Sequence, residues 1–333
     1  MKRTFFLLLI FFLCLCIVTD KTYAQSEKVW FAIKEGMENQ KLKLLMENNT
    51  TAFLTAFNEA ALKKRKPDFP SNIIVRNSQK QILSFWESTP MYCTKTYISE
   101  TCLKKLTGGF QIRNIPVHIP EAPEDSREQE IVINFNSSGL IEDITISIKE
   151  TRYREILDEY STVEDFGRRQ IIIDFIENFR TSYNIKDIKY IESVFSDQAL
   201  IVTGKVVKIV QTKDVAINNL LGTEKITYVT QTKKEYITNL KQTFTRNKYI
   251  DIQFEDIEVV RHPKNDYLYG VTLKQKWGSS TYNDTGYIFL MIDFKYEQQP
   301  MIHVRTWQPD SYNGKSLSKD EIFKLNDFNI QNL

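Results

Sequence analysis

The second half of the chain contains one strand-like segment after another, and this series most restricts the folds open to it. Short segments rich in β-branched and aromatic residues are typical of strands when turn residues separate them. The segments that meet this description are residues 199–209, 223–231, 249–262, 267–278, 285–294 and 301–307. One helix-like stretch, at about 233–245, interrupts the series. The pattern therefore predicts a strand-rich α+β domain.

Two helices are expected immediately before this series. Residues 168–183 place Ile172, Phe175 and Phe179 on one face at helical spacing, and residues 187–195 form a second, shorter helix. The stretch before them, residues 149–167, is highly charged and lacks a clear period. We interpret residues 151–167 as a linker that is partly helical, followed by a C-terminal domain over residues 168–333.

The first half predicts a second α+β domain over residues 25–150. Residues 26–46 and 50–65 have helical spacing, and the Asn48-Asn49 pair predicts a break between them. Near the end of this half, residues 129–148 alternate around an Asn-Ser-Ser-Gly turn and predict a β-hairpin. Both halves thus begin with a helix pair and close with a hairpin, which favours two domains in tandem.

The N-terminus has the three parts of a secretory signal peptide. Lys2 and Arg3 precede an apolar run from Phe5 to Val18, and a small residue, Ala24, ends the polar stretch that follows. An apolar run of this length is shorter than the ~20 residues that cross a bilayer. We therefore expect cleavage of residues 1–24 after Ala24 and export to the periplasm or the medium, without an integral membrane segment.

Charge and cysteine content limit the kinds of ligand and cofactor that the chain can be expected to bind. Removing residues 1–24 leaves 41 basic and 41 acidic residues, so no overall field attracts nucleic acid. Cys93 and Cys102 are the cysteines that remain, and they are either a disulfide in an oxidising compartment or two buried thiols. The histidines are widely spaced and show no metal-ligand pattern. We expect neither a metal nor another cofactor.

Residues 168–309 resemble the nuclear transport factor 2-like, or SnoaL-like, superfamily. The segments that carry the resemblance are residues 169–183 with Asp174-Phe175 and Asn178-Phe179-Arg180, residues 187–197 ending in Val194-Phe195-Ser196-Asp197, and the closing Ile292-Asp293-Phe294 and His303-Val304-Arg305-Thr306-Trp307. The pattern is similar to tandem-domain exported members from Bacteroidetes. The resemblance implies a cone of curved antiparallel sheet wrapped by N-terminal helices, in both halves of the chain.

The candidate site residues cluster near the last predicted strand. Alternation places His303, Arg305 and Trp307 on one face, which could bind an anionic or aromatic ligand or could equally be a wet or interdomain face. Asp293 lies on the preceding strand and could orient His303 or form a structural pair with it. Asp197, after the second helix, is either a residue at the mouth of the cone or part of a turn.

No catalytic motif, metal set or phosphate loop is recognisable, so we expect a non-enzymatic module of the cell envelope. It would bind a small molecule or an envelope protein, and it could form a homo-oligomer. The resemblance also implies an alternative, because the superfamily contains isomerases and dehydratases. In that case Asp293 or Asp197 would be the base and His303 its partner. A purely structural tandem is a third hypothesis.

Overall fold

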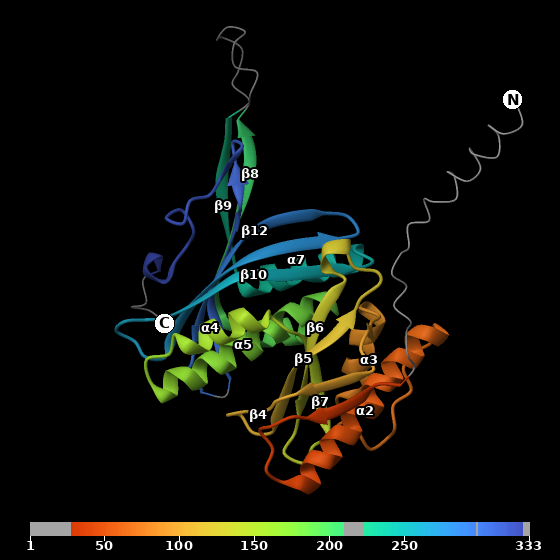
Figure 1. The fold of residues 1–333 in the computed structure, drawn as a ribbon. Helices are drawn as coiled ribbons and strands as arrows, with labels where there is room; N and C mark the ends of the chain where they lie inside the picture. The colour runs from red at the N-terminus through yellow and green to blue at the C-terminus, as the bar shows by residue number, and fades with distance from the viewer. Residues whose placement is uncertain (1–27, 210–222, 298, 329–333) are drawn as a thin grey trace, which may run out of the picture.

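A computed structural model of the chain describes residues 28–209, 223–297 and 299–328, and it has an α+β fold (Figure 1). The expected signal peptide, residues 1–24, lies outside these ranges. Within them, every helix is too short or too polar to cross a bilayer.

The N-terminal half packs two helices against an antiparallel sheet. The helices are α2 (Gln40–Lys63) and α3 (Gln79–Ser88), and a 3-10 turn, η1 (Glu124–Ser126), comes later. The sheet has the order β2-β5-β6-β7, with β4 also pairing with β5. Its strands are β2 (Tyr92–Cys93), β4 (Cys102–Lys104), β5 (Phe110–His118), β6 (Glu128–Phe135) and β7 (Ile141–Ile146). The hairpin predicted over residues 129–148 is confirmed as β6 and β7.

The predicted first helix, residues 26–46, is wrong in its first part. Residues there form β1 (Trp30–Ile33), which pairs in parallel with β3 (Tyr97–Glu100). Side chains of α2 accept hydrogen bonds from the β1 backbone, at 2.8 Å from Ile33 N–H to Glu47 and 3.0 Å from Phe31 N–H to Thr51. The predicted break at Asn48-Asn49 is also absent from α2. Asn49 is buried there because its side-chain amide donates to the Gly139 carbonyl at 2.8 Å.

Of the two alternatives for the cysteines, the structure has two thiols and no disulfide. Cys93 and Cys102 are both buried and free. Cys93 lies opposite Val117 on β5, whereas Cys102 lies opposite Ile112, five positions further along the same strand. Five residues of strand span about 15 Å, whereas bridged cysteines have Cα atoms roughly 4–7 Å apart. Backbone pairing therefore holds the two thiols too far apart to bond.

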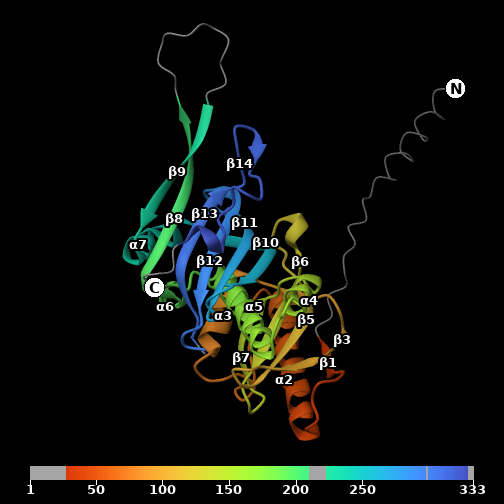
Figure 2. The same cartoon turned by 90° about the vertical axis from the view of Figure 1, so that its left-hand side faces the viewer.

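The C-terminal half is built on one six-stranded sheet with the order β10-β11-β12-β13-β8-β9 (Figure 2). Its strands are β8 (Phe195–Ile209), β9 (Thr223–Gln231), β10 (Ile250–Arg261), β11 (Leu268–Ser279), β12 (Asn283–Asp293) and β13 (Met301–Pro309). All neighbours are antiparallel except β13 and β8. The six strands predicted from the sequence are confirmed. After them come a small hairpin, β14 (Ser311–Tyr312) with β15 (Lys315–Ser316), and a 3-10 turn, η2 (Leu325–Asp327).

Helices cover the inner face of this sheet. They are α4 (Glu150–Asp158), α5 (Val163–Asn184), α6 (Ile188–Ser193) and α7 (Lys233–Arg246). The stretch interpreted as a linker, residues 151–167, contains most of α4, whose Tyr153, Ile156 and Leu157 belong to the C-terminal core. Where the two domains should be divided stays a prediction.

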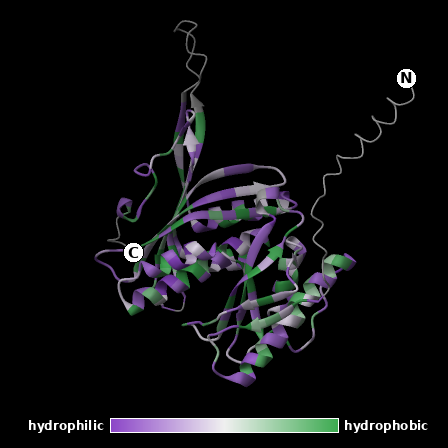
Figure 3. Cartoon of the chain, viewed as in Figure 1, coloured by the Kyte–Doolittle hydropathy of each residue, from purple (hydrophilic) through white to green (hydrophobic). Residues whose placement is uncertain are grey.

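Helix α5 lies between the two sheets and packs against both (Figure 1). Polar and apolar residues therefore mix along it, as Figure 3 shows for the helices between the sheets. On the side of the N-terminal sheet, Glu177 forms a fully buried ion pair with Arg113, and Asp174 accepts a hydrogen bond from Gln111 at 2.8 Å. The two halves are thus joined by a buried polar network.

Candidate functional site

A β-bulge in β13 decides which side chains face the inside of the C-terminal sheet. Met291 pairs with Val304 and Ile292 pairs with Ile302, so His303 is an extra residue in the ladder. Ile302 packs in the core on the inner face, whereas Val304 belongs to a separate cluster with Phe289 on the outer face. The two residues next to each other in the ladder therefore point to opposite faces.

Beyond the bulge, Arg305 and Trp307 return to the inner face. They pair with Leu290 and Ile288, which are both core residues of that face. The predicted grouping of His303 with Arg305 and Trp307 is therefore wrong for His303. The extra residue breaks the simple alternation on which the prediction depended.

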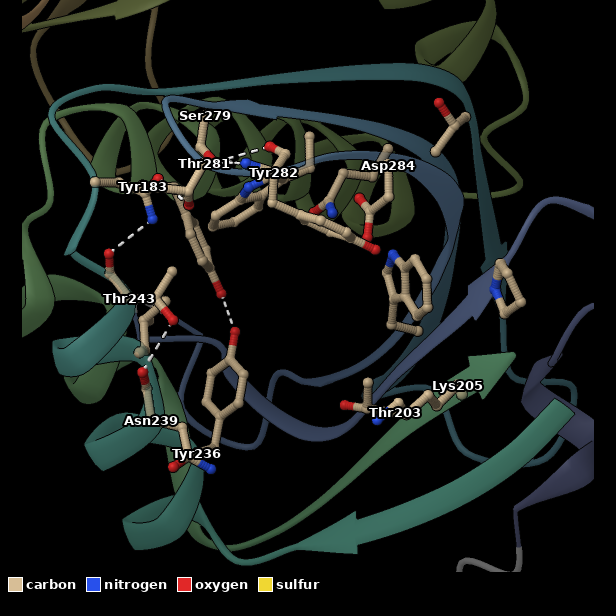
Figure 4. Close-up of a pocket in the computed structure, with 18 of the residues that line it drawn as sticks. Tyr183, Thr203, Lys205, Tyr236, Asn239, Thr243, Ser279, Thr281, Tyr282 and Asp284 are labelled. Carbon is tan, nitrogen blue, oxygen red and sulfur yellow. Dashed lines mark hydrogen bonds between the residues drawn. The ribbon is translucent and has the colours of Figure 1, made fainter. Parts of the chain in front are cut away.

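A cavity of about 730 Å³ lies on the inner face, between the sheet and α7. Arg305 and Trp307 both line it. Figure 4 shows Tyr183 and Tyr236 on one side of the hollow and Asp284 on the other. The other side chains that matter for its chemistry are Lys205, Gln231, Arg246, Trp277 and Tyr282.

Arg305 supplies a buried positive charge to this cavity. The residue is only 6% exposed, and its guanidinium lies 5.1 Å from the centre of the Tyr236 ring. Burial acts to lower its pKa, but Tyr236, Tyr183 and Asp284 together raise it above the usual value. Arg305 forms no ion pair with any carboxylate in the described ranges, and its Nε has no hydrogen-bond partner there. The cation is therefore held at the cavity without a fixed counter-charge.

Two tyrosines form the opposite wall. The hydroxyl groups of Tyr183 and Tyr236 are hydrogen-bonded to each other, and the Tyr183 ring stands edge-on to Trp277 with centroids 6.1 Å apart. Burial is the main cause that raises the pKa of Tyr183. Tyr236 is fixed by the first turn of α7, where Thr232 and Glu235 form a reciprocal capping box. One of the two O–H groups donates to the other in this pair, and the second remains available as a donor to a ligand.

Asp284 is the site residue that the sequence analysis missed. It pairs with Trp277 across the sheet and lines the cavity. Burial raises the pKa of its carboxyl, although a hydrogen bond from Tyr282 and the charge of Arg305 partly offset this. Gly286 stands two residues after Asp284 on the same face of β12. A Cβ atom on Gly286 would lie 2.8 Å from the Trp307 ring, so the glycine leaves room for that indole.

The other predicted residues lie outside the cavity. His303 approaches Asp293 at 3.4 Å, as the sequence hypothesis allowed, and both border a separate hollow of about 190 Å³. Burial lowers the pKa of His303 and the charge of Asp293 opposes this. The Asp197 side chain is 96% exposed and forms an ion pair with Lys233 at 2.8 Å. Among the residues that the structure covers, no three metal-ligating side chains gather as a metal site requires.

Comparisons with known proteins give structural matches alone. No family model matches the chain, and no curated protein matches it. Bd1075 of Bdellovibrio bacteriovorus is 11% identical and covers 67% of this chain and 83% of its own, with a TM-score of 0.33. A nuclear transport factor 2-like protein from Cytophaga hutchinsonii is 12% identical, with coverages of 42% and 97% and a TM-score of 0.30.

A further match is a protein of unknown function from Shewanella oneidensis, also described as nuclear transport factor 2-like. It is 12% identical and covers 41% of this chain and 94% of its own, with a TM-score of 0.27. The solved structures to which this chain is similar thus include nuclear transport factor 2-like proteins, the superfamily that residues 168–309 resemble in sequence.

Proposed function

We propose that the chain is an exported binding protein of the cell envelope, in which the C-terminal half is a nuclear transport factor 2-like cone that holds a small anionic ligand. In this proposal the N-terminal half is the second domain of a tandem. The observation that carries the proposal is Arg305, a buried guanidinium at a cavity that forms no ion pair with a carboxylate of the described residues.

Burial of an unpaired charge is costly, and proteins normally offset it with an opposite charge. Here an anionic ligand would supply that charge, and a carboxylate suits the planar guanidinium because two parallel hydrogen bonds can form. The walls favour a flat ligand, since Trp277, Trp307 and Tyr236 offer aromatic faces. A volume of about 730 Å³ is in the range of small-molecule sites, roughly 300–1,000 Å³.

The remaining charges of the cavity support the same ligand class. Lys205 and Arg246 line it, both are exposed, and neither forms an ion pair in the part of the chain that the structure describes. Two free cations beside a buried one attract anions into the hollow. Asp284 is the acidic residue that lines the same hollow, so three cationic side chains of the lining face one carboxylate.

Calorimetric titration with benzoate tests this proposal, with tryptophan fluorescence as a report from Trp277 and Trp307. We expect binding that Arg305→Met abolishes and that Arg154→Met, an exposed arginine on α4, leaves unchanged. Binding of benzoate equally to Arg305→Met, or binding of neither benzoate nor a hydroxybenzoate to the wild type, would overturn the proposed site. Mass spectrometry of the exported chain tests the proposed export, since the mature protein should begin at Gln25 after cleavage of the signal peptide.

Asp284 favours a second function, an acid–base enzyme of isomerase or hydratase type. A half-buried carboxyl with a raised pKa is suited to remove and return a proton, and the Tyr183–Tyr236 pair could donate a hydrogen bond to a carbonyl oxygen of the substrate. This moves the base from Asp293 or Asp197, which lie outside the cavity. Deuterium uptake by cyclic enones in heavy water, followed by NMR, tests it. Equal uptake in wild type and Asp284→Asn would rule out Asp284 as the base.

A further inference from the structure

Unpartnered polar atoms gather in the same cavity. Nine buried side-chain atoms of the described chain have no hydrogen-bond partner, and three of them belong to residues that line this hollow. They are Arg305 Nε, Asp284 Oδ1 and Gln231 Oε1. Buried polar atoms in native proteins are nearly always paired, so a group of orphans at one cavity indicates a missing partner.

The three atoms differ in what they require. Arg305 Nε carries a hydrogen and needs an acceptor, whereas Asp284 Oδ1 and Gln231 Oε1 are oxygen atoms and need donors. Arg305 is more than nine-tenths buried and therefore cannot turn to solvent for its partner. A ligand that fits all of them must combine an anionic acceptor with at least one hydrogen-bond donor.

We infer that the ligand is a planar organic acid that carries a hydroxyl or amino group, with its carboxylate on Arg305 and its donor on Asp284. This inference rests on the proposed function and specifies the ligand class of the same site. Asp284 and Arg305 stand on neighbouring strands, β12 and β13, which both present their inner face to the cavity. Arg305 pairs with Leu290, which lies six residues along β12 from Asp284. The charge of Arg305 still acts on the Asp284 carboxyl across the hollow, so one ligand lying along the strands can meet both groups.

Simple anions fit this site less well. Phosphate or sulfate would pair with Arg305, but acceptor oxygens would then meet Asp284 Oδ1, which is an acceptor too. Benzoate would satisfy Arg305 and leave Asp284 Oδ1 without a donor, at the cost that every buried acceptor without a donor carries. A hydroxyl or amino group removes that cost, so it should add affinity through Asp284 alone.

A ligand series tests the inference by calorimetry. The probes are benzoate, its three monohydroxy isomers and the corresponding methoxy isomers, which keep the shape and lack the donor. We expect at least one hydroxybenzoate to bind about 10-fold or more tightly than benzoate, because hydrogen bonds to charged groups are among the stronger ones. No methoxy isomer should show this gain. In Asp284→Ala the ratio of the two affinities should fall to about one, while Asp320→Ala, an exposed acid, should keep the wild-type ratio.

Each outcome has a separate meaning. If benzoate binds and no hydroxybenzoate binds more tightly, the inference is wrong and the proposed function stands. A gain that the methoxy isomers share, or that survives in Asp284→Ala, also overturns the role of Asp284. If neither benzoate nor any hydroxybenzoate binds, the proposed function is wrong and the inference falls with it. The comparison of hydroxy and methoxy isomers uses the wild-type chain. It therefore tests the need for a hydrogen-bond donor on the ligand even if Asp284→Ala fails to fold.

Discussion

Two arginines of this chain are buried to a similar depth and differ in what surrounds their charge. Arg113 faces Glu177 and also donates to Ser147 at 3.1 Å, so its charge is matched. Arg305 has tyrosines and a cavity instead of a carboxylate. Depth of burial is thus the same, but the first arginine is part of the framework and the second is available to a ligand.

Methionine at each position should separate the two roles. Arg113→Met leaves Glu177 as an uncompensated buried charge, and we expect a loss of about 3–5 kcal/mol in the free energy of unfolding. Arg305→Met removes a buried charge that has no carboxylate partner and leaves no counter-charge behind, so the loss should be much smaller than for Arg113→Met. Urea unfolding of both variants measures this. If Arg305→Met loses as much as Arg113→Met, Arg305 belongs to the framework and the binding proposal loses its main support.

Asp174 makes the stability of the chain depend on pH. Burial is the main cause that raises its pKa to about 6, against 3.8 for an ordinary aspartate carboxyl, while Lys105 and Gln111 act in the opposite direction. Because the folded state holds this proton more tightly than the unfolded state, the contribution to stability is complete below about pH 3.8 and disappears as the pH rises through about 6.

Asp174→Asn should abolish this part of the pH dependence. Two pKa units correspond to a free energy on the order of 3 kcal/mol. As the pH rises from 4 to 7, we expect the wild type to lose about that amount of unfolding free energy relative to Asp174→Asn. Urea unfolding over this range measures it. A difference that is constant with pH would show that Asp174 is ionised equally in both states.

At the scale of single residues, the sequence predicted part of the site. Arg305 and Trp307 were found because cationic and aromatic side chains stood two apart on an evident strand. Asp284 was missed because one acidic residue near the start of a strand is normally exposed. Its burial depends on Trp277 across the sheet and on α7 beyond the cavity, which are contacts that no local pattern reveals.

Among the elements, β13 has the largest effect on the site, because its bulge places His303 and Val304 before the inner face resumes at Arg305. We expect deletion of His303 to keep benzoate binding, since a regular ladder from Ile302 would still turn Arg305 inward. Deletion of Thr306 should abolish binding, because Trp307 would then turn to the outer face. Calorimetry with benzoate distinguishes the two. Loss of binding in both deletions would show that the bulge itself shapes the cavity.

Elements with a strong period were predicted well, and those held by side chains of other elements were not. The six strands of the C-terminal sheet follow alternation and match the prediction within a few residues. In contrast, β1 has only four residues, and its N–H groups bond to Glu47 and Thr51 of a helix. A strand of this kind leaves too short a pattern to separate it from the helix that follows.

At the scale of the whole molecule, α4 packs in the same core as the C-terminal sheet. Arg169 of α5 donates to the Ile156 carbonyl at 3.1 Å, and Tyr153, Ile156 and Leu157 are core residues. We expect a fragment of residues 150–333 to be more stable than one of residues 160–333 by more than about 3 kcal/mol, because burial of each such side chain contributes roughly 1.5–3 kcal/mol. Urea unfolding of the two fragments tests this. Equal unfolding midpoints would show that residues 151–158 add no stability, as expected of a linker.

The sequence predicted two units, but it did not predict how closely they are joined. The charges of residues 149–167 suggested that this stretch is exposed to solvent. Three apolar residues at helical spacing nevertheless bury one face of α4. In the same way, Asp174 and Glu177 look like an exposed face of α5 until the N-terminal sheet supplies Gln111 and Arg113. Such partners lie more than 60 residues away along the chain.

The bulge at His303 also bears on how this chain can change over evolutionary time. A residue gained or lost at that point is absorbed on the outer side of the sheet, so the side chains that face the cavity keep their direction. An insertion or deletion two or three residues later would turn Trp307 from the cavity to the outer face of the sheet. Homologous chains should therefore vary in length at His303 more freely than between Arg305 and Trp307. A residue can be inserted or lost at His303 while Arg305 and Trp307 still face the cavity.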